Sequence, residues 1–476
     1  MILSKLFLDR AVPKSSYTIL GYDDGIDDVD YWSRRNISVS IDSRTIKLGE
    51  IFLALKGKMC DGHDFIEQAI EKGASGVVIS RKDCLPNISL RHKGFLVIRV
   101  ADTMQALIGM AKMWRSTLRI PVVGITGSLG KTTTKEILRN ILMEASFNAY
   151  VSFKNQNTVI GLCLNILKVN KDHKVAVFEL GINEKGEMTV LADILRPSLG
   201  LITRVAHAHG EGLGDLSNIV YEKKQIFRHF TRGNIGIIYG DQDDIIGTCY
   251  DYPVAKFGCK TKNQVQARKI RVEKDDNGQL NTYFIFKWYD KKTAIKMRKN
   301  HPGQVLNVLA ASTIAYFLHV PFDSVVRGVE RFDGFEGRFE MKNLKNGNGC
   351  LISDCYSANP ESMKGALSSF EQISAKGKKI VVLGDMLELG DKTLYWHRQI
   401  GRFICGMQTL DVVILVGKRA SQIAKTAPSF VDIFEVKDWK EAQEKLNDCL
   451  NESDSFVLVK ASLGMELNKL VKFFVI

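Results

Sequence analysis

Short apolar runs alternate with helical stripes of hydrophobic residues along most of the chain. The runs Ile120–Thr126, Lys174–Leu180 and Ile235–Tyr239 are rich in β-branched residues and bounded by Gly or polar residues, which is typical of strands buried on both faces of a parallel sheet. A helical stripe follows the first run over Thr132–Ala145. This alternation of strands and helices predicts a doubly wound parallel sheet in the middle of the chain.

The pattern divides the chain into three α/β domains. Residues 1–100 predict a small domain. In it, residues 37–46 form a strand that ends in a turn, residues 50–57 form a second strand closed by Gly57, and residues 65–80 form a helix followed by a strand. Residues 101–332 contain the parallel sheet, and residues 333–476 predict a Rossmann-like domain with buried strands over 350–354, 379–385, 411–417 and 455–462.

Residues 263–297 differ from their surroundings. Their apolar and polar positions alternate, as in strands with one exposed face, and Asn277-Gly278 is a typical hairpin turn. We therefore expect an antiparallel addition to the central domain.

Length and composition agree with a multidomain globular protein. The chain has 476 residues, which exceeds what one hydrophobic core usually supports, with 45% hydrophobic and 25% charged residues. No apolar run is long enough to span a membrane. The apolar start, Met1–Arg10, is too short for a signal peptide, so we expect a cytoplasmic protein. The nine cysteines include no Cys-x-x-Cys pair, which argues against a zinc or disulfide framework.

The net charge of +13 allows several kinds of partner. Lys and Arg occur along the whole chain without a long basic block, so nucleic acid is the less favoured interpretation. Binding of small polyanions such as nucleotides would explain the positive net charge equally well, and so would a role in solubility alone.

A phosphate-binding loop is predicted where the strand at 120–126 ends. The sequence continues as Gly127-Ser128-Leu129-Gly130-Lys131-Thr132-Thr133 and then becomes helical. Glycines allow backbone N–H groups to face phosphate oxygens, and the helix N-terminus adds positive potential. Lys131 is expected to reach the β- and γ-phosphates, and Thr132 to place its hydroxyl on Mg²⁺. Ile125 stands where the general P-loop pattern has Gly, and the alternative is a glycine-rich turn without a ligand.

The wider motif, Gly124 to Thr133, is the shortened loop of Mur ligases and folylpolyglutamate synthases. Further segments resemble the Mur ligases, in particular those that add D-alanyl-D-alanine: Asp42–Ala74, Phe178–Met188, Asp354–Leu367 and Val381–Gly390, with His397 beyond them. Their order and spacing cover nearly the whole chain.

The resemblance implies an ATP- and Mg²⁺-dependent ligase of cytoplasmic peptidoglycan precursor synthesis. Such an enzyme joins D-alanyl-D-alanine to the terminal carboxylate of UDP-N-acetylmuramoyl-tripeptide through an acyl-phosphate. The third tripeptide residue could be lysine or diaminopimelate, and a monomer is expected. Alternatives are a Mur-type ligase that adds one amino acid, a folylpolyglutamate-synthase-like ligase, a P-loop kinase or GTPase, and a nucleotide-binding protein without activity.

The resemblance also implies roles for individual residues. Those expected at the reaction centre are Lys131, Glu179, His209 and Lys223, with Thr132, Glu179 and His209 as metal ligands and Lys223 as a carbamylated lysine. ATP is expected to contact residues 127–133 together with Asn307, Arg338 and Asp354. The substrate contacts implied are Ser43, Arg44, Asp61, His63, Asn157, Tyr356 and Asn359.

Some positions depart from the family pattern. Thr158, Val159, Gln225, Gln304 and Leu463 replace residues that the family usually has, and Lys460 could substitute for the cation missing at 463. A hinge is predicted near residues 332–337, where closure would exclude water from the acyl-phosphate.

Overall fold

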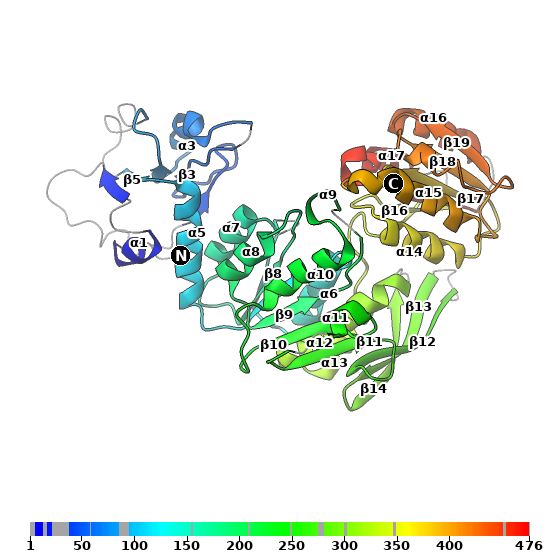
Figure 1. The fold of residues 1–476 in the computed structure, drawn as a ribbon, viewed down its shortest axis with the longest axis horizontal. Coiled ribbons are helices and arrows are strands. Elements are labelled where there is room, and N and C mark those ends of the chain that lie inside the picture. The colour runs from blue at the N-terminus through cyan, green and yellow to red at the C-terminus, as the bar shows by residue number, and fades with distance from the viewer. Residues whose placement is uncertain are drawn as a thin grey trace. The chain divides into compact units, whose positions relative to one another are not determined.

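The computed structural model describes residues 5–12, 17–20, 38–57, 59–84, 95–153, 156–207, 210–247, 250–274, 280–298, 302–345, 349–450 and 454–475. Within them the chain forms three sheets flanked by helices, one for each predicted domain (Figure 1). The α/β fold class is therefore confirmed. Among the described residues, no helix is long and apolar enough to cross a membrane.

The N-terminal sheet has the order β1-β5-β4-β3-β2. Its strands are β1 (Tyr17–Leu20), β2 (Val39–Ser40), β3 (Ile51–Leu53), β4 (Gly76–Ile79) and β5 (Leu96–Val100). Only β1 runs antiparallel to its neighbour. The helices are α1 (Lys5–Ala11), α3 (Ile66–Glu71) and α5 (Thr103–Thr117), and a 3₁₀ turn, η2 (Gly62–Phe65), precedes α3.

The central sheet has nine strands in the order β14-β13-β12-β11-β10-β9-β6-β8-β7. The parallel part comprises β6 (Val122–Thr126), β7 (Ala149–Val151), β8 (Val175–Glu179), β9 (Leu199–Ile202), β10 (Ile235–Tyr239) and β11 (Val254–Gly258). The strands β12 (Val265–Lys274), β13 (Leu280–Trp288) and β14 (Lys291–Arg298) extend it. β12–β13 and β13–β14 are antiparallel pairs, as predicted, whereas Asn277-Gly278 lies outside the described residues.

Several helices accompany the central sheet. They are α6 (Lys131–Glu144), α7 (Val159–Lys168), α8 (Glu187–Leu195), α9 (Gly210–Leu213), α10 (Leu216–Lys224), α11 (Asp243–Ile246), α12 (Val305–Phe317) and α13 (Phe322–Glu330). Helix α12 packs on β10, β11 and β12, and α6 packs on α12 and α13. Tight turns η3 (Gln225–Phe227) and η4 (Pro302–Gln304) adjoin α10 and α12.

The C-terminal sheet has the order β15-β16-β20-β17-β18-β19. Its strands are β15 (Glu340–Asn343), β16 (Gly349–Asp354), β17 (Lys379–Gly384), β18 (Val412–Val416), β19 (Asp432–Val436) and β20 (Ser455–Lys460). All neighbours except β15–β16 are parallel. The helices α14 (Pro360–Glu371), α15 (Thr393–Ile404), α16 (Trp439–Cys449) and α17 (Leu467–Phe474) cover two apolar cores.

By proximity of its backbone, the chain divides into two compact units. The first contains Met1–Gly124, Asn148–Gly181 and Thr189–Ser198, and the second contains Ile125–Phe147, Ile182–Met188 and Leu199–Ile476. The phosphate loop and the C-terminal sheet thus belong to the second unit, whereas Glu179 belongs to the first. The domain boundaries predicted at residues 100 and 332 stay predictions.

Two predicted strands are shorter in the structure. Among the described residues of 37–46, only β2 is a strand, and the turn predicted at the end of this segment covers residues 43–45. Within 50–57, the strand β3 ends at Leu53. For the first strand the physical reason is local. The Asp42 carboxylate accepts hydrogen bonds from the Arg44 N–H at 2.9 Å and from the Arg44 guanidinium, which stabilises a turn in place of strand pairing.

Candidate active site

The loop between β6 and α6 is a tight cradle fixed to neighbouring segments. Gly127 and Gly130 have φ of 146° and 82°, and a Cβ at either position would collide with the side chain of Thr203 or Asn307. Only glycine fits both requirements. The N–H groups of Ser128 and Leu129 donate to the Arg204 carbonyl at 2.8 and 3.2 Å, so the end of β9 holds the loop in position.

Lys131 and the threonines after it begin helix α6. The Lys131 Nζ donates to the Gly127 carbonyl at 2.8 Å, so its ammonium lies against the loop that is predicted to bind phosphate. Thr132 is buried, and Thr133 faces a cavity. The N–H groups of a helix N-terminus favour an anion, so this end of α6 is suited to phosphate.

Glu179 ends β8 in the first unit and is 2% exposed. The Asn157 side-chain amide donates to Glu179 Oε1 at 3.1 Å, and the Glu179 N–H donates to Ser152 Oγ at 3.2 Å. A Cβ on Gly181 would press on the Asn157 side chain, which explains the glycine in the Glu-Leu-Gly sequence. The structure therefore brings together Glu179 and Asn157, which the sequence predicts as a metal ligand and a substrate contact.

Lys223 is buried near the end of α10, with 1% of the residue exposed. Burial, with a contribution from the charge of Lys131, holds the pKa of the Lys223 amine well below its ordinary value. Within the described residues its amine has no hydrogen-bond or ion-pair partner. The lowered pKa favours the neutral amine, which is the form that reacts with CO₂ to give a carbamate.

His209, the third predicted metal ligand, lies outside the described residues. Its neighbour His207 is described, and its ring lies 5.0 Å from the Trp396 ring, centroid to centroid. Among the described residues, no group of three or more His, Cys, Asp or Glu side chains is arranged to hold a metal ion.

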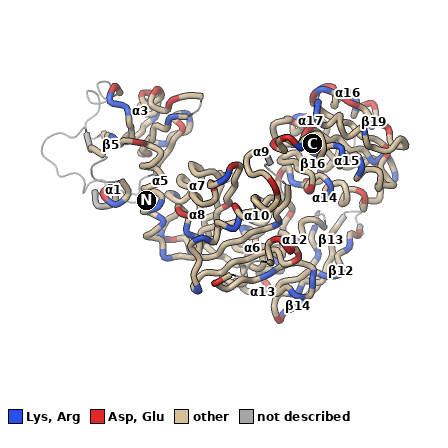
Figure 2. The backbone as a smooth tube through the Cα atoms, in the orientation of Figure 1, with Lys and Arg blue, Asp and Glu red and all other residues tan. Residues whose placement is uncertain are grey.

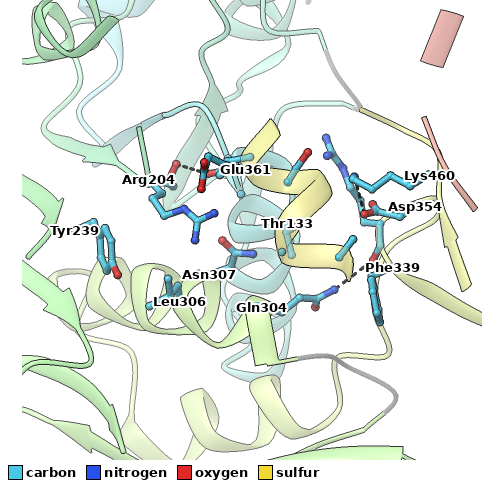
Figure 3. Close-up of a pocket in the computed structure, with 18 of the residues that line it drawn as sticks. Thr133, Arg204, Tyr239, Gln304, Leu306, Asn307, Phe339, Asp354, Glu361 and Lys460 are labelled. Carbon is cyan, nitrogen blue, oxygen red and sulfur yellow. Dashed lines mark hydrogen bonds and ion pairs between the residues drawn. The ribbon is translucent and has the colours of Figure 1, made fainter. Parts of the chain in front are cut away.

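A cavity in the second unit lies beside the phosphate loop (Figure 3). Thr133 and Asn307 face it from α6 and α12, and Arg204 reaches it from the end of β9. On the other side of the view lie Phe339, Asp354 and Lys460. The cavity thus combines predicted ATP contacts from the central and C-terminal sheets.

An ion pair and a stacked cation fix the C-terminal side of this cavity. Lys460 Nζ donates to Asp354 Oδ2 at 2.7 Å and to the Ser357 carbonyl at 3.0 Å, across the adjacent strands β20 and β16. The Arg338 guanidinium carbon lies 4.1 Å from the centre of the Tyr356 ring, a cation–π contact.

Asn359 begins helix α14 beside this ion pair. Its side chain accepts a hydrogen bond from the Ser362 N–H at 2.9 Å and so caps the helix. Asn359 therefore has a structural role whether or not it also contacts substrate.

The N-terminal substrate residues form two internal clusters. The Asp42 carboxylate accepts two hydrogen bonds from the Arg44 guanidinium, which lower the pKa of Asp42 to about 2. His63 is buried; its Nδ1 lies 2.6 Å from Asp61 Oδ1 and its Nε2 accepts from the Ser80 N–H at 2.9 Å. Both imidazole nitrogens are therefore engaged within the protein. The predicted contacts of Asp61 and His63 with substrate stay predictions.

Ser43 is also buried in this domain. Its hydroxyl donates to Gln68 Oε1 at 2.6 Å, which ties the turn after β2 to helix α3. Its contact with substrate stays a prediction.

Several residues that line the cavity were not predicted as contacts from the sequence, among them Arg204, Gln304 and Glu361. Gln304 is 3% exposed and donates from Nε2 to the Arg338 carbonyl at 3.3 Å, while its Oε1 has no hydrogen-bond partner among the described residues. The position of Arg204 directly after a buried parallel strand was a usable signal, because ligands bind at the carboxyl ends of such strands. Nothing local distinguished Glu361, which follows the helix cap Asn359.

The chain matches three family models in succession. Residues 37–115 match the catalytic domain of the Mur ligase family, residues 125–315 the Mur ligase middle domain, and residues 337–463 the Mur ligase glutamate ligase domain.

Similar proteins cover almost the whole chain. The UDP-N-acetylmuramoyl-tripeptide–D-alanyl-D-alanine ligases of Bacillus subtilis and Treponema pallidum are 30% and 31% identical to it, each over 91% of this chain and 92% of the relative. Among solved structures, MurF from Acinetobacter baumannii has a TM-score of 0.83 at 26% identity, covering 99% of this chain and 98% of that one. The MurF ligase of Thermotoga maritima in complex with ADP has a TM-score of 0.80 at 25% identity, covering 92% and 97%. The phosphate loop, the three sheets and these matches agree, and the chain belongs to the Mur ligase family.

Proposed function

We propose that this chain joins D-alanyl-D-alanine to the terminal carboxylate of UDP-N-acetylmuramoyl-tripeptide, using ATP, as a cytoplasmic step of peptidoglycan precursor synthesis. The proposal rests chiefly on one observation: the glycine-rich cradle at Lys131 adjoins a cavity that also carries Arg338 and Asp354. The relatives named above carry this activity in their names, and the neighbour from Thermotoga maritima binds ADP.

The reaction balances in two steps. The tripeptide carboxylate attacks the γ-phosphorus of ATP, the bond to the bridging oxygen breaks, and an acyl-phosphate and ADP form. The amine of D-alanyl-D-alanine then attacks the acyl carbon, loses a proton, and expels phosphate as the amide forms. Because both steps gather negative charge, the enzyme contributes mainly by positioning the groups and neutralising that charge.

Each cation near the cavity is suited to neutralise part of this negative charge. Lys131 is proposed to leave the Gly127 carbonyl and meet the β- and γ-phosphates, while the planar guanidinium of Arg338 suits a phosphate or carboxylate. The buried pair of Lys460 and Asp354 is proposed to orient the groups around it.

Mg²⁺ fits the residues proposed for it. The buried hydroxyl of Thr132 and the buried carboxylate of Glu179 are oxygen donors, which Mg²⁺ prefers, and His209 is carried over as a further ligand. One or two carboxylates with phosphate and water oxygens suffice for Mg²⁺, in keeping with the absence of a larger acidic or histidine cluster among the described residues. When bound, the ion would neutralise phosphate charge during transfer.

A carbamate at Lys223 would place an anion where the chain has a buried lysine amine. The neutral amine attacks CO₂ and loses a proton, which yields the carbamate without another reactant. The lowered pKa of Lys223 supports this assignment, and the adjacent Lys224 is half-exposed and hydrogen-bonded to the Asp244 carbonyl at 3.3 Å.

Phosphate release with single omissions tests the proposed function. Wild-type protein with Mg²⁺-ATP, UDP-N-acetylmuramoyl-tripeptide and D-alanyl-D-alanine should release phosphate and form UDP-N-acetylmuramoyl-pentapeptide, and each omission should stop product formation. Lys131→Ala should abolish turnover with an unchanged unfolding transition. Product formed with a single amino acid in place of the dipeptide would sink the proposal in favour of another ligase of the superfamily. So would product formed from a folate and glutamate in place of the UDP-linked tripeptide and the dipeptide.

A further inference from the structure

The positive charge of the chain is concentrated in one segment. Residues 256–300 contain 13 Lys or Arg and 4 Asp or Glu, a net charge of +9 against +13 for the whole chain. Lys and Arg still occur along the whole chain, but most of their excess over Asp and Glu lies in this segment. Figure 2 shows this concentration as repeated blue segments along β12 and β14.

The antiparallel strands β12–β14 place these cations on one face. Lys287 pairs with Lys292, and Tyr283 lies between Arg271 and Lys296 in register. Alternate residues of β13 point to opposite faces, and its other face carries Phe284, Phe286 and Trp288, which are buried. We call the opposite face, with Arg268, Arg271, Lys287, Lys292, Lys296 and Arg298, the basic sheet face.

The strands themselves carry little compensating charge. Glu273 is the single acidic residue within β12–β14, and it pairs with Arg271 at 2.5 Å. Arg268 donates to the neutral side chain of Gln266 at 2.7 and 3.1 Å. Packing several like charges on adjacent strands is unfavourable in itself, because like charges directly opposite repel. An anionic partner would relieve that repulsion.

The geometry favours an extended, diffuse anion. Neighbouring strands lie roughly 4.8 Å apart, so the face is an extended array of cations, and the described cavity lies elsewhere, beside the phosphate loop. Stacking platforms for single-stranded nucleic acid need free aromatic faces. The aromatic residue on this face, Tyr283, already has Arg271 and Lys296 at 5.4 and 5.9 Å from its ring centre.

From this arrangement we propose that the basic sheet face docks the enzyme on an anionic lipid surface. Contact is electrostatic and reversible, because the face carries few large apolar side chains: Ile270 is exposed at 37%, and Ile285 is half-buried. Basic residues held near an anionic bilayer each contribute roughly fivefold to partitioning, and the attraction extends over about one Debye length. The docking surface is separate from every residue proposed for ATP or substrate.

Vesicle co-sedimentation of the full chain at low salt tests the proposal. We expect binding to vesicles of two parts phosphatidylcholine and one part phosphatidylglycerol, no binding to phosphatidylcholine alone, and loss of binding when salt is raised. The variant R268Q/K287Q/K292Q should bind roughly a hundredfold more weakly, given roughly fivefold per cation. The matched control K425Q/K437Q/K472Q removes the same charge from exposed positions in the C-terminal domain and should bind like wild type.

Ligase turnover of both triple variants should match wild type, which shows that they fold and that failure of docking is distinct from failure of the proposed reaction. Equal loss of vesicle binding in the two triple variants would reduce the effect to net charge and overturn the proposal. So would absence of binding to anionic vesicles at low salt. Binding to an RNA oligonucleotide that depends on Arg268, Lys287 and Lys292, without vesicle binding, would assign the face to nucleic acid instead.

Discussion

Two buried lysines of the second unit have opposite surroundings. Lys460, at the end of β20, forms an ion pair with Asp354 at 2.7 Å, whereas Lys223, near the end of α10, has no partner among the described residues. Both are 1% exposed. Burial alone therefore does not indicate function. A buried amine in an ion pair is expected to have a structural role, whereas a buried amine with a lowered pKa is a candidate for chemistry.

The largest expected effect is on stability, at Lys460. Lys460→Met leaves Asp354 buried without its cation, and we expect the free energy of unfolding to fall by about 3–5 kcal/mol. Urea unfolding would measure it. Lys469→Met, which breaks the exposed pair with Glu466, should cost at most about 1 kcal/mol. The double variant Lys460→Met/Asp354→Leu should recover much of the loss; an equally unstable double variant would contradict the paired-charge explanation.

For Lys223 we expect the opposite of Lys460, a large loss of turnover with little loss of stability. Lys223→Met removes the proposed carbamate, and we expect turnover to fall at least about a hundredfold. Unfolding free energy should stay the same or rise, because an unpaired buried amine is unfavourable. Lys224→Met is the matched control and should keep near wild-type turnover.

The lowered pKa of Lys223 also predicts the direction in which stability changes with pH. Its folded pKa is lowered, so between that pKa and the ordinary value near 10.4 the unfolded chain binds more protons. Stability should therefore rise with pH in that window for wild type, and less steeply for Lys223→Met. A large loss of stability in the variant would place Lys223 with Lys460 as a structural residue.

Arg204 extends the comparison to a cation that is only half-buried. Its carbonyl holds the phosphate loop, while its side chain lines the cavity. Arg204→Leu keeps the carbonyl and removes the charge, so we expect KM for ATP to rise about tenfold with little change in kcat. Steady-state kinetics would show it, with the exposed Arg232→Leu as control. An unchanged KM would mean that the guanidinium does not meet the nucleotide.

The smallest expected effect comes from a buried histidine in the C-terminal domain. His397 accepts from the Met386 N–H at 3.1 Å, its Nδ1 lies 2.7 Å from the Thr393 carbonyl, and burial lowers its pKa. Because the unfolded chain binds a proton that the folded chain resists, stability should fall as pH drops below about 6.5, by at most about 1.4 kcal/mol per pH unit. His397→Gln should flatten this slope, and urea midpoints across pH would measure the change.

Local pattern was enough for most of the framework. The apolar runs at 122–126, 235–239 and 412–416 are strands close to their predicted bounds, because a strand buried on both faces must be apolar throughout. Local sequence pattern predicts less about which strands pair when the partners are far apart in the chain. The antiparallel pairing of β1 with β5 joins segments about 80 positions apart, and no periodicity in either segment specifies that partner.

For the candidate site, too, some features were predicted from the sequence and others are seen only in the tertiary structure. Gly127, Gly130, Lys131 and Thr132 lie close together in the chain, so sequence alone predicted a phosphate loop and, with the distant motifs, the ligase family. Only the tertiary structure decided that Asn307 presses on Gly130, that Arg204 enters the cavity and that Lys223 is buried without a partner among the described residues. The physical reason is that a pKa and a contact depend on which distant segments surround a side chain, whereas a turn depends on its own residues.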